Sequence, residues 1–131
     1  MEMKDAPIIG KDALGRDVRD LSVIPWWGVD RKTIDWSPTI DSGKCSGCAT
    51  CFITCGRRVY DWDTELQKAV VVQPDNCQVG CTTCANLCPS GAIRFPDLTV
   101  AHHAAARAQM VKKAFQQTKH LRPEGAKPEE E

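Results

Sequence analysis

Eight cysteines, grouped four and four, constrain this chain more than any other feature of its sequence. The first group is Cys45, Cys48, Cys51 and Cys55, in KCSGCATCFITCG, and the second is Cys77, Cys81, Cys84 and Cys88, in NCQVGCTTCANLCPSGAI. The second group repeats the first with one additional residue after its first cysteine, which indicates an internal duplication of about 30 residues. The start of the chain lacks the apolar stretch of a secretory signal, so we expect metal ligands rather than disulfides.

The C-x2-C-x2-C-x3-C spacing of the first group is found in proteins that hold cubane iron–sulfur clusters. A tight loop can bring three thiolates onto such a cluster before its own backbone interferes, so the fourth ligand must come from elsewhere. The alternative is a structural interaction module with a zinc ion in each four-cysteine site. Zinc ribbons usually separate two C-x2-C pairs by a longer stretch, so the dense spacing favours iron.

Through TIDSGKCSGCATCFITC and PDNCQVGCTTCANLCPSGAI, the sequence resembles the bacterial-type 2(4Fe-4S) dicluster ferredoxin family over about 60 of its 131 residues. The resemblance implies a pseudo-twofold α+β fold, in which each half supplies two short strands and one short helix beginning near its third cysteine. It also implies low-potential electron transfer.

In two-cluster ferredoxins the fourth cysteine of such a run ligates the other cluster. We therefore expect two 4Fe-4S clusters with ligands from both groups. Cluster one is assigned to Cys45, Cys48, Cys51 and Cys88, and cluster two to Cys77, Cys81, Cys84 and Cys55. Gly56 departs from the family pattern, because many members have a proline after the fourth cysteine.

Residues 38–98 are expected to form the cluster-binding domain, and the rest of the sequence is expected to form extensions on both sides of it. Residues 1–37 contain prolines and glycines that break any periodicity, so we expect an irregular N-terminal arm. Within the domain, RRVYDWDTELQKAVVVQP predicts two strands joined by a turn. The alanine spacing predicts an amphipathic basic helix over 99–122, and residues 123–131 have the composition of a solvated tail. The four tryptophans, Trp26, Trp27, Trp36 and Trp62, are expected to fill core or interface rather than to shield a cluster.

The charge balance excludes one class of partner, since 17 basic and 17 acidic residues give no basic excess of the kind that binds nucleic acid. No apolar run approaches the roughly 18 residues of a membrane span, so we expect a cytoplasmic protein without membrane insertion. The basic helix, which has no acidic residue between 101 and 122, is expected either to dock on the acidic core or to bind a partner subunit.

No nucleophile, acid–base pair or phosphate-binding loop is recognisable, so we expect neither an independent enzyme nor a small-molecule substrate. The expected role is one-electron transfer with a redox partner enzyme or within an oxidoreductase complex. A freely diffusing carrier and a fixed subunit both remain open. The long extensions favour the fixed subunit, because they provide surface for permanent contacts.

Overall fold

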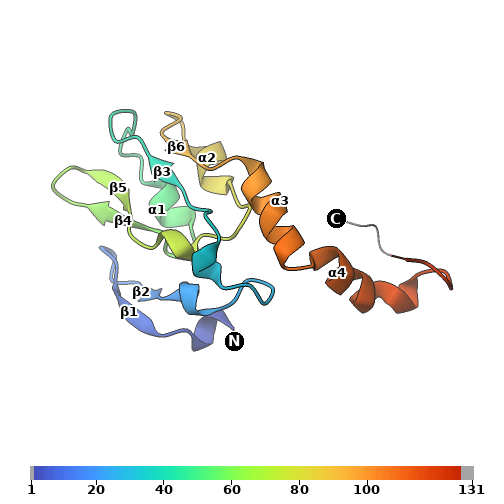
Figure 1. Cartoon of the computed structure of the whole chain (residues 1–131). Coiled ribbons are helices and arrows are strands. Elements are labelled where there is room, and N and C mark those ends of the chain that lie inside the picture. Colours follow the sequence, from blue (N-terminus) through green and yellow to red (C-terminus); the bar gives the residue numbers. More distant parts are fainter. Residues whose placement is uncertain (1, 128–131) are drawn as a thin grey trace.

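The computed structural model describes residues 2–127 and shows short helices beside small sheets (Figure 1). Within these residues six strands form three two-stranded antiparallel sheets: β1 (Ile8–Lys11) with β2 (Asp17–Arg19), β3 (Thr39–Ile40) with β6 (Ile93–Arg94), and β4 (Tyr60–Asp63) with β5 (Lys68–Val71). The α-helices are α1 (Thr50–Thr54), α2 (Thr83–Leu87), α3 (Leu98–Arg107) and α4 (Met110–Thr118). Short 3-10 helices cover Met3–Asp5, Leu21–Val23, Arg31–Thr33, Pro74–Asn76 and Lys119–Leu121.

The β4–β5 hairpin joins the two cysteine groups, and this confirms the two strands and turn predicted from the sequence. The turn forms because the Asp63 carboxylate accepts hydrogen bonds from the backbone N–H groups of Glu65 and Leu66. Gln67 completes it with a left-handed φ of 55°. Because β3 pairs with β6, the strands before the first cysteine group and after the second also meet.

Helices α1 and α2 occupy corresponding places in the two cysteine groups. Each has five residues and begins one residue before the third cysteine of its group. The fourth cysteine follows as the C-cap, Cys55 after α1 and Cys88 after α2. The two helices pack against each other, so the two groups meet in space.

The N-terminal segment contains a hairpin, so the prediction of an irregular arm is wrong for residues 8–19. Its turn is organised by Asp12, whose buried carboxylate accepts hydrogen bonds from the N–H groups of Leu14 and Arg16 and from Arg16 Nε, at 2.7 Å. Gly15 supplies a positive φ of 78°. The hairpin therefore depends on the hydrogen bonds of one aspartate at its turn, and not on the alternation of apolar and polar residues from which strands are usually predicted.

The hydrophobic core draws on both flanking segments as well as on the segment between them. It contains Ile34, Trp36, Phe52, Val59, Tyr60, Cys77, Val79, Ile93 and Ala104. Trp36 stacks on Phe95 with 5.4 Å between ring centroids, and Trp62 stacks on Phe52 at 6.2 Å. These contacts confirm packing for two of the tryptophans, whereas Trp27 is 44% exposed.

Asn76 connects the N-terminal segment to the loop before the second cysteine group. Its fully buried side chain accepts a hydrogen bond from the N–H of Leu21 at 2.9 Å. It donates hydrogen bonds to the carbonyl groups of Arg19, at 2.8 Å, and Arg57, at 3.0 Å. Three backbone groups from two distant segments therefore depend on one amide.

We expect Asn76→Ala to lower the free energy of unfolding by about 2–4 kcal/mol, because it leaves these backbone groups without partners. Asn86→Ala is the matched control, since Asn86 is exposed in α2 and its removal should cost no more than about 0.5 kcal/mol. Anaerobic denaturant titration followed by far-ultraviolet circular dichroism measures both variants. Equal effects of the two substitutions would contradict the role given to Asn76.

The C-terminal segment forms two helices, so the prediction of one helix over 99–122 is wrong. Gln109 takes a left-handed conformation, with φ 53° and ψ 44°, between α3 and α4. The break follows tertiary contacts: Ala104 and Ala108 are buried, and beyond the break Lys113 Nζ donates to the Trp27 carbonyl at 2.6 Å. Alanine, glutamine and methionine all suit a helix, so their sequence does not reveal the break.

The basic segment was expected either to dock on the protein's own core or to bind a partner subunit. Helix α3 docks on the core, since Ala104 belongs to it. Arg107 also donates hydrogen bonds to the carbonyl and hydroxyl oxygens of Thr33. Figure 1 shows α4 continuing from α3 away from the sheets.

Residues 128–131 of the expected tail lie outside the described residues. None of the helices between residues 2 and 127 has the length and apolar content needed to cross a membrane.

Candidate metal centres

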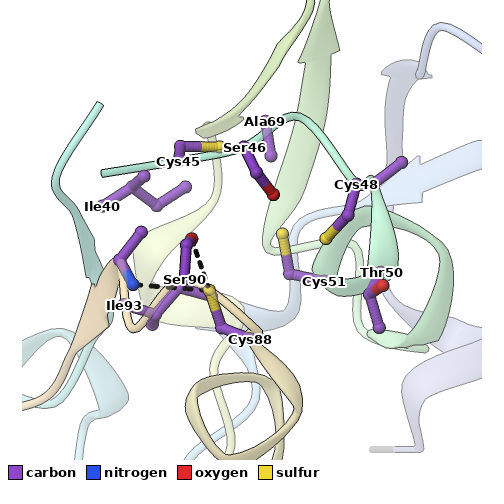
Figure 2. A pocket seen from close by; sticks show the side chains of 12 residues that line it. Ile40, Cys45, Ser46, Cys48, Thr50, Cys51, Ala69, Cys88, Ser90 and Ile93 are labelled. Carbon is purple, nitrogen blue, oxygen red and sulfur yellow. Dashed lines mark hydrogen bonds between the residues drawn. The ribbon is translucent and has the colours of Figure 1, made fainter. Parts of the chain in front are cut away.

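The first cavity is lined by cysteines of both groups, Cys45, Cys48, Cys51 and Cys88. Figure 2 shows their sulfur atoms around one shared space, with Ile40 and Ile93 at its wall. The other lining residues are Ser46, Ala49, Thr50, Ala69, Ser90 and Ala92. No charged side chain is among these lining residues.

The second cavity is lined by the other four cysteines, Cys55, Cys77, Cys81 and Cys84. Its wall also contains Pro38, Thr54, Gly56, Arg57, Val59, Tyr60, Gln78 and Thr83. Helix α1 places Cys51 at the first cavity and its C-cap, Cys55, at the second. Each cavity thus combines three cysteines of one group with the fourth cysteine of the other.

Hydrogen-bond donors point at sulfur in the first cavity. The N–H of Ala92 donates to Cys88 Sγ at 3.4 Å, and Ser90 Oγ lies 3.5 Å from the same sulfur, as the dashed lines in Figure 2 show. The Ser90 hydroxyl, with backbone N–H groups, lowers the pKa of Cys88. The hydroxyl and N–H of Thr50 lower the pKa of Cys48 in the same way. These donors favour the thiolate, which is the form that binds metals.

In the second cavity, burial is the largest influence on the pKa values of Cys77 and Cys84. It raises the pKa of the Cys77 thiol to about 12, and it also raises that of Cys84. The hydroxyl of Tyr60 lies 3.0 Å from Cys84 Sγ, and burial raises the pKa of this phenol. The phenol therefore keeps its proton and can donate a hydrogen bond to a Cys84 thiolate. In the first cavity, burial likewise raises the pKa of Cys51 to about 11.

A buried cation lies beside the second cavity. Arg31 is 3% exposed, and its guanidinium donates to the carbonyl oxygens of Cys77, at 2.9 Å, Ile34, at 2.9 Å, and Trp36, at 2.6 Å. Arg57, in the wall of the cavity, donates to the carbonyl of Asn76. Arg57 and Arg31, whose Nη1 lies 3.8 Å from the Asp75 carboxylate, therefore place positive charge beside the second cavity, whereas no residue that lines the first cavity is charged.

Arg31, Tyr60 and Ser90 were not singled out by the sequence. Ser90 follows Cys88 by two residues, so its position after CP could have indicated it. Arg31 and Cys77 are 46 residues apart, and no local spacing relates them. Contacts of this kind arise only from the packing of the N-terminal segment.

The donor sets fit the group that the resemblance implies. Four thiols, donors aimed at sulfur and largely apolar walls suit a 4Fe-4S cluster, whose properties depend on hydrogen bonding to sulfur, burial and charge. In the part of the chain that the structure describes, no three histidine, cysteine or acidic side chains are close enough together to hold a single metal ion.

Comparisons with known proteins cover both cysteine groups. A family model described as a 4Fe-4S dicluster domain matches residues 44–92. Ferredoxin-3 of Nostoc sp. is 35% identical over 74 residues, which cover 41% of this chain and 75% of the relative. A ferredoxin of Methanothermococcus thermolithotrophicus is 39% identical over 59 residues, with 44% and 93% covered. Subunit IorA of an indolepyruvate oxidoreductase of Pyrococcus horikoshii is 42% identical over 53 residues, which cover 40% of this chain and 8% of that subunit.

The family model spans all eight cysteines, and the two ferredoxins are matched over most of their own length. These matches favour iron–sulfur clusters over the alternative of zinc sites. The residues before 44 and after 92 lie outside the family model. The chain belongs to the 4Fe-4S dicluster ferredoxin family and carries two 4Fe-4S clusters for electron transfer.

Proposed function

We propose that this protein transfers single electrons through two clusters held as the cavities group the cysteines. Cluster one is assigned to Cys45, Cys48, Cys51 and Cys88, and cluster two to Cys77, Cys81, Cys84 and Cys55. The observation that carries this proposal is the exchange of fourth cysteines at the C-caps of α1 and α2. Because of this exchange, the backbone of each helix links a cysteine of one cavity to a cysteine of the other.

The same arrangement supports a pseudo-twofold relation between the halves. One half contains β3, α1 and β4, and the other contains β5, α2 and β6. Exchanging the halves converts the β3–β6 pair into the β5–β4 pair, and both pairs are antiparallel. We infer a duplicated fold of which both copies are needed to complete either site.

Each bound cluster supplies a change of one electron, and the chain's own residues set the conditions for it. The thiolates hold the group in place. Ser90 and Ala92 at one cavity, and Tyr60 at the other, donate hydrogen bonds to sulfur and so favour the more negative, reduced state. The apolar walls exclude water. No bond in a substrate is made or broken in this function.

Metal and acid-labile sulfide analysis of anaerobically purified protein tests the proposal. We expect about eight iron and eight sulfide per chain, with electron paramagnetic resonance signals of interacting reduced clusters after dithionite. Cys88→Ser should alter the signal of cluster one, and Cys55→Ser that of cluster two. About two zinc ions without sulfide would contradict the electron-transfer function. Two serine variants that alter the same cluster would contradict only the ligand assignment.

Gly47 provides a further prediction for cluster one. Its φ is 77°, and a Cβ added to it would lie 2.6 Å from the carbonyl oxygen of Gln67. Gly47→Ala should therefore shift the loop that carries Cys45 and Cys48, cost about 1–2 kcal/mol in backbone strain, and lower the iron content. Iron analysis and the cluster-one resonance signal measure this. Gly10→Ala is the control, because Gly10 has open space and no positive φ, and it should keep its full iron content.

We further propose that the chain is a fixed electron-transfer subunit of an oxidoreductase complex, in which a second protein carries out the chemistry. Large apolar side chains of the N-terminal segment are about half exposed, which suits a permanent interface. They are Ile8, Ile9 and Leu14. The similarity to part of an oxidoreductase subunit agrees with this role. A cytoplasmic location is proposed with it, because free thiols used for metal binding suit a reducing compartment.

Affinity purification of the tagged protein from its natural host at low and high salt tests the fixed-subunit role. A stable complex held by apolar contacts should persist at high salt, because only electrostatic contacts are screened. Recovery of the protein alone under both conditions would favour a freely diffusing carrier.

A further inference from the structure

A basic pocket lies between the N-terminal segment and the residues that follow Cys55. Its lining is Met3, Lys4, Asp17, Arg19, Leu21, Gly56, Arg57 and Arg58. Four of these side chains are cationic and one is a carboxylate. That carboxylate, Asp17, pairs with Lys11 at 2.7 Å, and Lys4 pairs with Glu2 at 3.3 Å, so the three arginines leave the pocket positive on balance.

The guanidinium groups of the basic pocket are held by backbone carbonyls and not by carboxylates. Arg19 donates to Ala6 and Arg58 to Cys55. Within residues 2–127, Arg19, Arg57 and Arg58 form no ion pair. The Nε of Arg58 is buried without a hydrogen-bond partner in this part of the chain. The positive charge of these three arginines is therefore not neutralised by a carboxylate of the described residues.

The backbone of Arg58 adds an independent observation, because it takes a left-handed conformation with a φ of 59°. Such a conformation is uncommon for a residue with a side chain, and here, as at Gln67 and Gln109, it changes the direction of the chain. It turns the chain sharply after Cys55 and Gly56, so that Arg58 lines the basic pocket and Val59 returns to the core.

The basic pocket is adjacent to the second cavity, since Gly56 and Arg57 line both. Gly56 directly follows Cys55 and has no side chain to cover this edge of the cavity. A Cβ added to it would meet nothing within 4 Å. A protein seated in the basic pocket would therefore be separated from cluster two by little more than one stretch of backbone.

We propose that the basic pocket is the surface on which an acidic redox partner docks to exchange electrons with cluster two. Charge complementarity identifies the occupant: carboxylates of the partner pair with Arg58, and compete with Glu2 for Lys4, whose side chain is 76% exposed. Met3, 48% exposed, supplies apolar contact in the same pocket, as protein interfaces require. This inference rests on the proposed electron transfer through cluster two, and it assigns a specific role to the N-terminal segment.

Electron-transfer rates to two proteins of opposite charge test the docking surface. The reduced protein is mixed by stopped flow with flavodoxin, an acidic acceptor, and separately with cytochrome c, a basic one. The test variant carries Lys4→Gln and Arg58→Gln. The control carries Lys112→Gln and Lys119→Gln, which make the same change in net charge on exposed residues of the C-terminal segment. All proteins are first shown to contain the same iron and sulfide.

At low salt the test variant should react with flavodoxin about tenfold more slowly than the unchanged protein, and high salt should remove this difference. Its reaction with cytochrome c should not slow, and the control variant should behave as the unchanged protein does. Equal slowing with both acceptors would indicate a changed reduction potential and overturn the proposal.

Two other outcomes would also overturn the proposal. An equal effect of the control variant would show that only net charge matters. Binding of inorganic phosphate by the unchanged protein and not by the test variant, with equal flavodoxin rates for the two proteins, would identify a small-anion site instead of a protein surface. Absence of clusters from the unchanged protein would instead contradict the proposed function, so the two failures are distinguishable.

Discussion

Removal of iron and sulfide is expected to unfold residues 38–98 and to release the flanking segments from them. The sheets have two strands each, and an isolated two-stranded sheet is marginally stable at best in water. Helices α1 and α2, with five residues each, are far shorter than an isolated stable helix. The bonds between thiolates and metal must therefore supply much of the folding free energy, as they do in small zinc domains.

The apo protein can be prepared anaerobically with acid or a chelator and compared with the loaded protein. We expect the far-ultraviolet circular dichroism to change to that of a largely unfolded chain, and limited proteolysis to cleave between residues 38 and 98. Reconstitution with iron and sulfide should restore both properties, which controls for irreversible damage. An apo protein that keeps its circular dichroism and its resistance to protease would show that the apolar core is sufficient without clusters.

Arg31→Met is expected to lower the free energy of unfolding by about 3–5 kcal/mol, the largest effect of a single substitution that does not remove a cysteine. The buried guanidinium joins the carbonyls of Ile34 and Trp36 to that of Cys77, so methionine would leave three carbonyls without this partner. Loss of the cation should also shift the reduction potential of cluster two to a more negative value, because charge near a cluster tunes its potential.

Two variants make this prediction specific. Arg31→Lys keeps the charge but lacks the planar fork that reaches three carbonyls, so we expect an intermediate loss of stability and a smaller shift in potential. Arg94→Met removes an exposed arginine of β6 and should change stability by no more than about 0.5 kcal/mol. Denaturant titration and potentiometric titration followed by electron paramagnetic resonance measure both quantities. Equal stability of the Arg31→Met and Arg94→Met variants would contradict the structural role of Arg31.

Local features of the chain were predictable from the sequence. The cofactor followed from the spacing of the cysteines, and the family from the resemblance of the two cysteine motifs to those of dicluster ferredoxins. The β4–β5 hairpin followed from two β-prone runs around a turn that Asp63 organises. In both cases the interacting groups are near neighbours in the sequence. The expected partition of ligands between the clusters stays a prediction, which the serine variants test.

Contacts between distant residues were not predictable from the sequence. They account for the two predictions that were wrong, the irregular arm over residues 8–19 and the single helix over 99–122. The hairpin at residues 8–19 depends partly on Asp61, 48 residues away, which accepts a hydrogen bond from the N–H of Ala13. The break at Gln109 occurs where Lys113 meets the Trp27 carbonyl, across 86 residues. Neither contact leaves a pattern in the sequence near it.

The sequence by itself determined which cofactor the chain carries, because ligand type and spacing are local properties that a cluster must satisfy. Only the tertiary structure decided the surroundings of the two sites: the buried Arg31 beside Cys77, the phenol of Tyr60 at Cys84 and the basic pocket next to Gly56. The physical reason is that charge, burial and hydrogen bonding at a point depend on every segment packed around it. In this protein, those segments come from both ends of the chain as well as from its cysteine groups.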